Sequence, residues 1–483
     1  MDGYLLGIGD GPDASCEYRP AIVSMETWDH LLKCYPAMRG HGPAAEYRHI
    51  YGYLATTGFL DEARGVPVLP RSVFAQMLGV RPNTHSLRMG QAMEAFSRDV
   101  APIVVHPCRY TKGLATVVEM DVPDEIRARL DQDHRELACG HWKGMVQLGS
   151  GERVRGSFTY PVGGSGGAPP ADHPAAGVLS LINSQPLTAI RRLFRTNMPC
   201  ALEEADRIGS PVARSHVLAE LARIGAGHPS VYRHSPLTPR IHARGASPDR
   251  LPKQVRRALF KGCVEIDMVA AGLTIAAYRW NLTAIKGMLQ QEEPFWEQAL
   301  RKSHLSETDL PIVKRFVLAT LYGARRDTAN EMLKDGHGQH EGIGAQGLRS
   351  LAGTAWVKEL RAGARSALRT IRYKGFVTDA FGRKLSTNDV RNLREAGRRM
   401  DRIMLAILLQ SIEMKIMRSV VPVIRSENRT RTSIRMVSWQ HDGLTLSFVS
   451  PSERDRQVKR TRDAIVSAAA EIGISARVRA RCL

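Results

Sequence analysis

The sequence predicts an α+β protein of mixed strands and helices, with a mainly helical N-terminal module. Three observations predict this class. Val264 to Asp267 is a short apolar run that ends in a carboxylate, and a helix-forming stretch follows it at once. Two β-rich runs flank His441, Asp442 and Gly443, which predicts a hairpin with an acid at its tip. Amphipathic stretches with helical spacing account for much of the remaining chain.

Length and charge limit the class of function. The chain has 483 residues, and 68 Lys plus Arg against 48 Asp plus Glu give a net charge of +20. This length is typical of roughly two to four domains. Clustered basic residues release counterions when they neutralise phosphates, so a polyanion is the first partner to test, although a merely soluble basic surface gives the same sum. No signal-peptide pattern or long apolar run is present, so we expect a cytoplasmic protein without a membrane partner.

Residues 1–159 form the predicted N-terminal module. Within it, residues 72–100 predict a short helix, a break at 79–83 and a second amphipathic helix, which resembles a helix-turn-helix. Residues 102–123 then predict two strands around Thr111 to Gly113, as in a wing hairpin. Plain packing of helices is the alternative to a DNA contact here.

A linker and a helical region follow the module. Gly, Pro and Ala replace any periodic pattern at 160–177, which predicts a flexible linker. Residues 179–224 are predicted to be helical and carry the basic residues Arg191, Arg192 and Arg195. A solvated helix face is the simpler explanation of these charges.

Two aspartates stand at the ends of predicted strands. Asp267 closes the run VEID, and Asp442 lies at the tip of the predicted hairpin. Carboxylates on neighbouring strands can hold two Mg²⁺ ions, which stabilise the attacking and leaving oxygens of an in-line phosphoryl displacement. A simpler interpretation stays open for each residue, because Asp267 can cap the following helix and His-Asp-Gly can be an ordinary turn.

A helix predicted between the two aspartates supplies a further pattern. Ser306 to Asp309 has the composition of a capping box, and Lys314, Leu318 and Tyr322 follow at i, i+4 and i+8 on one face. Such a stripe can bind a triphosphate through the lysine and stack a base or sugar near the tyrosine. The alternative is an amphipathic helix whose lysine extends along apolar surface.

The order of these elements resembles motifs A, B and C of the family A polymerases, the group that contains bacterial DNA polymerase I and the phage-type and mitochondrial single-subunit RNA polymerases. A strand ends in Asp267, the helix KRFVLATLYG carries Lys314 and Tyr322 eight residues apart, and a hairpin bears His441 and Asp442. Further similar elements are TPRI at 238–241, RRALF at 256–260, GFVTDAFGRKL at 375–385, and Arg402 and Gln410 eight residues apart.

The resemblance covers residues 235–483 and implies a right-hand palm-fingers-thumb core. It implies palm and fingers in this part, with the fingers at about 285–375, and a thumb-like helical region at 178–234. Asp267 and Asp442 are implied to be the catalytic ligands of two Mg²⁺ ions, with Mn²⁺ as a substitute. The implied nucleotide contacts are Lys314, Tyr322, Gly272 and Arg315. The implied primer and template contacts are Arg240, Arg402, Gln410, His441 and Gly323.

The chain departs from the family pattern in two places. Motif B normally carries an arginine four residues before its lysine, and this chain has Leu310 there, so Arg315 or Arg325 must supply the lost charge. Ala406 replaces an asparagine that is often found between the arginine and glutamine of the primer-side helix.

Residues near the aspartates predict the kind of product. DNA polymerases of this family usually carry glutamate five residues after the first aspartate, where its bulk blocks a ribose 2′-hydroxyl, whereas this chain carries Gly272 followed by Leu273, as the RNA polymerases do. Gly443 favours the same interpretation. We therefore expect a template-directed enzyme that makes RNA from nucleoside triphosphates, as a DNA-directed RNA polymerase or a primase-like enzyme, with a DNA template favoured.

Two alternatives stay open at this point. One is a family A DNA polymerase without proofreading and with relaxed sugar selection. The other is a non-catalytic DNA-binding replication protein on a degenerate palm.

Overall fold

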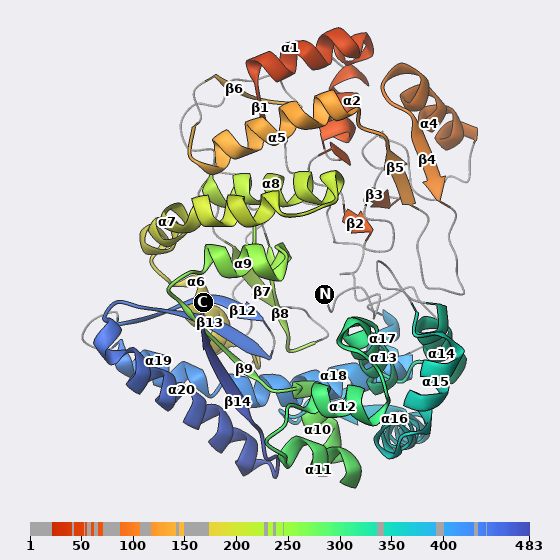
Figure 1. Cartoon of the computed structure of the whole chain (residues 1–483), viewed down its shortest axis with the longest axis vertical. Coiled ribbons are helices and arrows are strands. Elements are labelled where there is room, and N and C mark those ends of the chain that lie inside the picture. The colour runs from red at the N-terminus through yellow and green to blue at the C-terminus, as the bar shows by residue number, and fades with distance from the viewer. Residues whose placement is uncertain are drawn as a thin grey trace.

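The computed structural model of the chain forms an elongated body, with the N-terminal elements at one end and the C-terminal half at the other (Figure 1). It describes residues 22–40, 43–52, 54–55, 59–61, 66–70, 87–106, 117–141, 144–148, 173–226, 230–234, 238–244, 246–335, 342–392, 400–428, 433–440 and 442–483.

The N-terminal module combines helices with two small sheets. Its helices are α1 (Met25–Cys34), η1 (Pro36–Met38), α2 (Pro43–Gly52), α4 (Leu87–Asp99) and α5 (Asp124–Ala138). Its strands are β1 (Ile22–Ser24), β2 (Phe59–Asp61), β3 (Val66–Pro70), β4 (Ile103–His106), β5 (Val117–Met120) and β6 (Met145–Gln147). Strand β1 pairs with β6, and the others form a sheet in the order β2-β3-β5-β4. The module holds more strand than we predicted, because strands of three residues leave no alternating pattern.

The predicted helix-turn-helix is covered only in part. Its second helix corresponds to α4, and its wing strands correspond to β4 and β5, which pair antiparallel with Ile103 opposite Met120. Strand β5 also pairs with β3, so β4 and β5 belong to a larger sheet and do not form an isolated two-stranded wing. The first helix and the turn lie outside the described residues, and a DNA contact stays a prediction.

A layer of helices joins this module to the rest of the chain. It consists of α7 (Leu187–Asp206) and α8 (Pro211–Gly225), whereas α6 (Ala176–Asn183) packs against β7 (Val231–His234). Helix α8 packs against α5 on one side and α7 on the other, and α7 packs against α9 (Lys253–Leu259). The helical prediction for 179–224 is confirmed, with breaks before Pro186 and Pro211. The region 178–234 ends in strand rather than helix, at β7 (Val231–His234). Most of the predicted linker lies outside the described residues.

The sheet that positions the candidate site lies in the C-terminal half. Its strands β9 (Val264–Met268), β12 (Ile434–Gln440), β13 (Gly443–Phe448) and β14 (Val478–Cys482) run in the order β12-β13-β9-β14, each antiparallel to its neighbour. Buried residues such as Ile266 and Leu444 point to the face covered by α18 and α20. On the other face, Cys263 and Val437 pack with α7 and α9. The candidate site lies on this second face of the sheet, at the end of β9 that carries Asp267.

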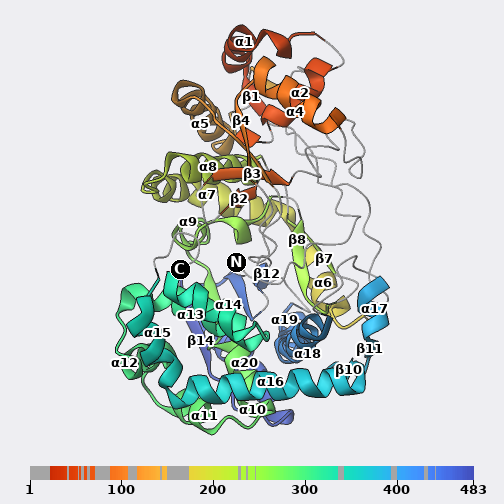
Figure 2. The same ribbon diagram turned by 90° about the vertical axis from the view of Figure 1, so that its right-hand side faces the viewer.

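The remaining elements surround this sheet. The strands β7 and β8 (Ile241–Arg244) form one hairpin, and β10 (Phe376–Thr378) and β11 (Lys384–Ser386) form another, as GFVTDAFGRKL predicts. The helices are η4 (Pro248–Arg250), α10 (Ala271–Arg279), α11 (Thr283–Gln290), α12 (Phe295–Lys302), η5 (Glu307–Asp309), α13 (Leu310–Leu321), α14 (Arg326–Asp335), α15 (Gly344–Gly353), α16 (Ala355–Lys374), α17 (Thr387–Asn392), α18 (Met400–Met417), α19 (Val420–Glu427) and α20 (Pro451–Glu471). Figure 2 shows α16 running along the lower edge of the molecule towards β10.

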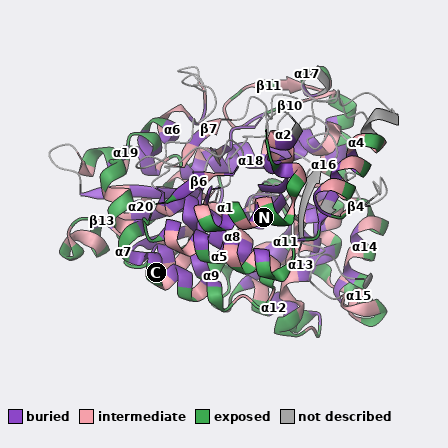
Figure 3. Cartoon of the chain, turned by 90° about the horizontal axis from the view of Figure 1, so that it is seen from above, coloured by how far each residue is buried: buried purple, intermediate pink, exposed green. Residues whose placement is uncertain are grey.

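Helix α18 lies in the middle of the largest core. Apolar side chains occur around its whole circumference, which is typical of a helix that is buried on all sides. It packs against α10, α16 and α20, and Figure 3 shows it among the buried residues while outer helices such as α12 present exposed faces. Polar groups on such a helix must find partners in the interior.

Candidate active site

Strand β9 carries a polar face and an apolar face. In the run VEIDM, buried residues alternate with half-exposed ones, so Glu265 and Asp267 share one face while Val264, Ile266 and Met268 enter the core. The predicted strand is therefore confirmed, and it delivers Asp267 to the open face near its C-terminal end.

The second aspartate lies beside the first. Gln440 pairs with Gly443 across the β12–β13 hairpin, and Asp442 directly precedes β13. Gly443 in turn lies opposite Asp267, and the carbonyl of Asp442 accepts a hydrogen bond from the amide of Met268 at 2.9 Å. Because directly opposed residues of antiparallel strands lie about 5 Å apart, Asp267 and Asp442 stand at one end of the same sheet. His441 lies outside the described residues.

Gly443 allows the two strands to approach closely at this point. A Cβ atom on Gly443 would lie 3.1 Å from the Cβ of Asp267 and 3.1 Å from the carbonyl oxygen of Ile266. Both distances are tighter than ordinary contact, so a side chain here would require β9 at Ile266 and Asp267 to shift by a few tenths of an ångström. The small residue after Asp442 thus has a packing reason in addition to the one we inferred from the resemblance.

The carboxylate of Asp267 is only partly satisfied. Its Oδ2 accepts a hydrogen bond from Nη2 of Arg479 at 2.9 Å. Its Oδ1 is buried and has no hydrogen-bond partner within the described part of the chain. Buried oxygens without a partner are costly, and a bound ligand is one way to satisfy them.

These residues fit a magnesium site of a particular kind. Within the described residues, no group of three or more His, Cys, Asp or Glu side chains could hold a metal ion. Mg²⁺ does not need such a group, because it is often held by one or two carboxylates while water and substrate phosphates complete its octahedron. The unsatisfied Oδ1 of Asp267 and the neighbouring Asp442 supply carboxylate oxygens of this type.

Helix α13 presents the predicted stripe. Ser306 and Asp309 form the predicted capping box, in which the amide of Ser306 donates to Oδ2 of Asp309 at 2.8 Å. Lys314, Leu318 and Tyr322 are all half-buried, as expected for one shared face at the border between core and solvent. The predicted helix and its exposed stripe are therefore confirmed.

Lys314 has an aromatic neighbour and cationic ones. Its Nζ lies 5.3 Å from the centroid of the Trp296 ring. Partial burial lowers the pKa of Lys314, and the charges of Lys253 and Arg479 lower it further. The lysine of α13 therefore lies within electrostatic range of Lys253 and Arg479.

Gly323 has a structural task at the end of α13. The amides of Gly323 and Ala324 donate to the carbonyls of Thr320 and Ala319, at 2.9 and 2.8 Å, which is the Schellman pattern. Gly323 has φ +78°, and a Cβ there would lie 2.6 Å from Cδ1 of Leu368. Its predicted contact with template stays a prediction beside this capping role.

Gly272 also packs closely against a neighbour. A Cβ at this position would lie 2.8 Å from Cδ2 of Leu321, where α10 contacts α13. The glycine therefore permits close approach of the two helices. This is a packing explanation that competes with the predicted opening for a ribose hydroxyl.

Arg240 and Gln410 are buried rather than exposed. Nη2 of Arg240 donates to both carboxylate oxygens of Glu413 at 3.2 Å, and the side-chain oxygen of Gln410 accepts from Thr238 at 2.6 Å. These bonds connect the segment 238–240 to α18. A contact between either side chain and a primer or template stays a prediction, and it requires this interior pairing to open.

Two other predicted residues lie nearer the surface. Arg315 is half-buried and follows Lys314 on α13, about 100° around the helix. Arg402 is half-buried in the first turn of α18, next to Asp401, which pairs with Arg372 of α16 at 2.6 Å. Their roles stay predictions.

The β12–β13 hairpin has an interior support that we did not predict. Asp249 is buried and accepts hydrogen bonds from Ser438 at 2.7 Å and from Tyr232 at 3.1 Å, and the oxygen of Tyr232 accepts from the amide of Trp439. Burial raises the pKa of Asp249, although the hydrogen bond from Ser438 opposes the shift. This network fixes β12 just before the turn that bears Asp442.

Basic residues from the C-terminal strand were also missed. Arg479 and Arg481 lie opposite Asp267 and Glu265 in the sheet. A signal was present, because Arg477, Arg479 and Arg481 alternate with small or apolar residues, which is the pattern of a strand with one basic face. The sequence gave no indication that this strand pairs with β9.

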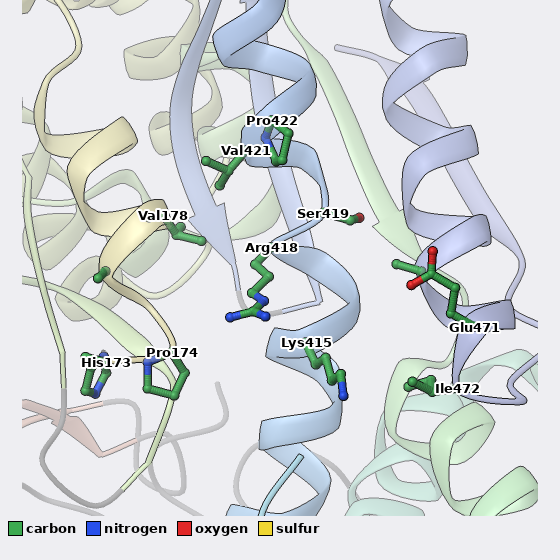
Figure 4. A pocket seen from close by; sticks show the side chains of 13 residues that line it. His173, Pro174, Val178, Lys415, Arg418, Ser419, Val421, Pro422, Glu471 and Ile472 are labelled. Carbon is green, nitrogen blue, oxygen red and sulfur yellow. The ribbon is translucent and has the colours of Figure 1, made fainter. Parts of the chain in front are cut away.

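A separate cavity lies on the helix-covered side of the sheet. It has a volume of about 460 Å³ and lies between α6, α18, α19 and α20. Figure 4 shows Lys415, Arg418 and His173 around it, with Glu471 on the opposite wall. None of the predicted site residues lines this cavity.

Comparisons with known proteins give limited information. No protein-family model matches the chain, and no curated protein matches it. Among solved structures, the chain is similar to the POL domain of Pol1 from M. smegmatis, in complex with DNA primer-template and dNTP, with 12% sequence identity and a TM-score of 0.44. The match covers 91% of this chain and 81% of that chain. A function for the aspartates therefore has to be inferred from their own surroundings.

No helix within the described residues is long and apolar enough to cross a membrane.

Proposed function

We propose that the chain is a nucleotidyltransferase that extends a nucleic acid strand on a template. The observation that carries this proposal is the meeting of Asp267 and Asp442 at the end of one sheet, with one buried carboxylate oxygen left for a ligand. The half-buried stripe of α13, whose Lys314 lies within electrostatic range of Arg479, supports a substrate that carries phosphate groups.

In the proposed reaction, the 3′-hydroxyl of a strand attacks the α-phosphate of a nucleoside triphosphate. A bond forms between the 3′-oxygen and the α-phosphorus, the bond to the bridging oxygen breaks, and pyrophosphate leaves. Lys314 donates hydrogen bonds to the phosphates and offsets the negative charge that develops on the leaving group. Tyr322, two turns further along the same stripe, contacts the base or sugar.

Asp267 and Asp442 are the ligands that we assign to the metal ions. When bound, Mg²⁺ would lower the pKa of the attacking hydroxyl and stabilise charge on the phosphoryl oxygens. The hairpin network around Asp249 supports β12 just before Asp442, and the absence of a side chain at Gly443 lets β13 lie close to β9 at Asp267.

We propose ribonucleotides as the favoured substrates, because glycine at position 272 leaves no bulk to exclude a ribose 2′-hydroxyl. The contact between Gly272 and Leu321 favours a second candidate, a DNA polymerase of the same architecture in which the glycine serves helix packing alone. The two candidates share the aspartates and differ in the sugar that they accept.

Primer extension tests this proposal. Purified chain is incubated with Mg²⁺ and a labelled primer on a DNA or an RNA template, with either four rNTPs or four dNTPs. We expect extension on the DNA template, with rNTPs used at least as well as dNTPs. A strong preference for dNTPs would favour the DNA polymerase, and DNA binding without extension in any mixture would favour a non-catalytic DNA-binding protein.

A further inference from the structure

The open face of the sheet beside Asp267 carries more positive than negative charge. Strand β9 contributes two carboxylates, Glu265 and Asp267. Strand β14 places Arg481 and Arg479 directly opposite them, and Nη2 of Arg257 on α9 lies 3.2 Å from Oε2 of Glu265. Three guanidinium groups therefore face two carboxylates on β9, and Asp442 at the end of the same sheet adds a third carboxylate, so the surplus of positive charge depends on the lysines.

Two lysines supply this surplus. Lys253 is the first residue of α9, and the charges of Arg257, Arg481 and Arg479 lower its pKa after the larger effect of partial desolvation. Lys314 approaches from α13, and its pKa is lowered by burial and then by the charges of Lys253 and Arg479. Within the described residues neither lysine forms an ion pair with a carboxylate, although the charge of Glu265 raises the pKa of Lys253 and partly offsets the effect of the three arginines. A group of basic side chains with fewer carboxylates beside it is typical of a site that binds an anion.

Arg479 differs from the other cations because it occupies an oxygen of Asp267. Its guanidinium is 53% exposed, so the side chain can leave the carboxylate without opening the core. Exposed ion pairs add little stability, and exchange of this contact for another therefore costs little. The register of β14 keeps the arginine at the edge of the site after such an exchange.

We propose that Lys253, Lys314 and Arg479 form a phosphate-binding cluster, and that Arg479 moves from Asp267 to the phosphates when a metal ion binds the carboxylate. The triphosphate as the natural ligand rests on the function proposed above. The cluster supplies positive charge from α9 and β14. This charge replaces the arginine of the family pattern, because α13 carries Leu310 at that position.

The exchange gives Arg479 two successive partners. Without metal, it neutralises Asp267 and reduces repulsion between that carboxylate and Asp442. With metal, the ion takes over this neutralisation, and the guanidinium can form charge-assisted, bidentate hydrogen bonds to phosphate oxygens. Arg479 is in this account a positioning residue for Asp267 and a ligand of the substrate.

Binding of inorganic tripolyphosphate in metal-free buffer, measured by calorimetry, tests the cluster without any need for synthesis. The variants are Arg479→Gln, Arg479→Lys and Lys253→Gln. The matched control is Arg462→Gln, an exposed arginine on α20, on the covered side of the sheet. Loss of one partly exposed charge should weaken the binding of tripolyphosphate about fivefold. Arg479→Lys should retain most of the affinity, and the control should bind like the wild type.

A Mn²⁺ titration tests the exchange. Removal of the competing guanidinium in Arg479→Gln should tighten Mn²⁺ binding about two- to fivefold, since the cation no longer competes for Oδ2 of Asp267. Tripolyphosphate binding that is unchanged in both Arg479→Gln and Lys253→Gln would overturn the cluster. Mn²⁺ affinity that is unchanged or weaker in Arg479→Gln would overturn the exchange.

The two proposals fail separately. If the wild type extends no primer but the cluster variants still lose tripolyphosphate, the polymerase function is wrong and the anion site stands. If primers are extended and the variants bind tripolyphosphate like the wild type, the cluster is wrong and the polymerase function stands.

Discussion

Two regions of the molecule hold residues that the same resemblance selected, and they differ in how far their ion pairs are exposed to solvent. At the end of β9, the carboxylate of Asp267 pairs with Arg479, and the two side chains are 25% and 53% exposed. Beside α18, Arg240 pairs with Glu413, and these side chains are only 9% and 6% exposed. The first pair can therefore exchange partners with solvent or a ligand at the surface, whereas the second pair is enclosed in the interior.

This difference predicts which residues matter for chemistry and which matter for the stability of the fold. A buried ion pair such as Arg240 with Glu413 is strongly destabilising to break, because the remaining charge has no solvent. Substitution of the partly exposed Asp267 should change the free energy of unfolding much less, because solvent can reach its partner Arg479. We therefore expect substitutions in the first region to affect chemistry and substitutions in the second to affect stability.

The largest effect should follow from Asp442→Asn. Removal of one metal-binding charge should reduce primer extension by about a thousandfold or more, because metal ions contribute several kcal/mol to such reactions. Thermal unfolding and DNA binding should stay close to the wild type. Asp455→Asn on α20, where the carboxylate is 88% exposed, is the control and should keep full activity. Unaltered extension by Asp442→Asn would remove the aspartate from the mechanism.

The second effect concerns the buried pair. Glu413→Gln should lower the free energy of unfolding by about 3–5 kcal/mol, since it leaves the guanidinium of Arg240 without its counter-charge. Urea unfolding measures this, with the exposed Glu297→Gln as a control that should change stability by less than about 0.5 kcal/mol. The double variant Arg240→Met with Glu413→Leu should recover part of the loss. If Glu413→Gln folds normally and instead loses primer-template binding, Arg240 contacts nucleic acid and our contrast between the regions is wrong.

Acid should lower the free energy of unfolding through two histidines, which belong to helices α5 and α8 and to neither of the two regions compared above. His134 on α5 is buried and His216 on α8 is partly buried, and desolvation followed by the charge of Arg223 lowers their pKa values from 6.5 to about 3 and about 4. The unfolded chain therefore binds more protons below pH 6.5, and stability falls as the pH falls. Between pH 6.5 and 5.5 we expect a loss of about 2 kcal/mol in the free energy of unfolding. At lower pH, protonation of Asp131 and Asp133, whose pKa values burial raises, opposes the loss.

Urea unfolding at a series of pH values measures this dependence. A variant with His134→Gln and His216→Gln should show a flatter curve over the same interval. An equally steep curve in that variant would mean that other groups cause the acid sensitivity.

The smallest effect concerns sugar selection at Gly272. Gly272→Glu should reduce the use of rNTPs relative to dNTPs by about tenfold, because the new side chain occupies the space of a 2′-hydroxyl. Gly272→Ala is the matched control for packing, since its Cβ displaces only the tip of Leu321. Single-nucleotide addition with each sugar measures the ratio. If the ratio is the same in all three proteins, the glycine serves helix packing and the DNA polymerase alternative gains support.

Local patterns were sufficient to predict the parts of the site that depend on neighbouring residues. The alternation in VEIDM, the hairpin that bears Asp442, and the stripe from Lys314 to Tyr322 each follow from spacing within a few residues, and the structure contains all three elements. The capping box at Ser306 was predictable for the same reason.

Long-range pairing was not predictable in the same way. Arg479 reaches Asp267 across 212 residues of sequence, and Arg240 reaches Glu413 across 173. Strand order and register decide these contacts, and neither leaves a mark on local periodicity. For this reason the resemblance implied a primer or template contact for Arg240 without indicating its buried partner Glu413, and nothing in the sequence analysis indicated Arg479.

The most direct test of the central claim is a double-mutant cycle on metal affinity. Mn²⁺ binding is measured by electron paramagnetic resonance for the wild type, Asp267→Asn, Asp442→Asn and the double variant. If the two aspartates share one site, each single variant should weaken Mn²⁺ about tenfold or more, and the double variant should lose much less than the sum of the two free-energy changes. Additive losses, or single variants with wild-type affinity, would contradict a shared metal site at the end of β9 and β13.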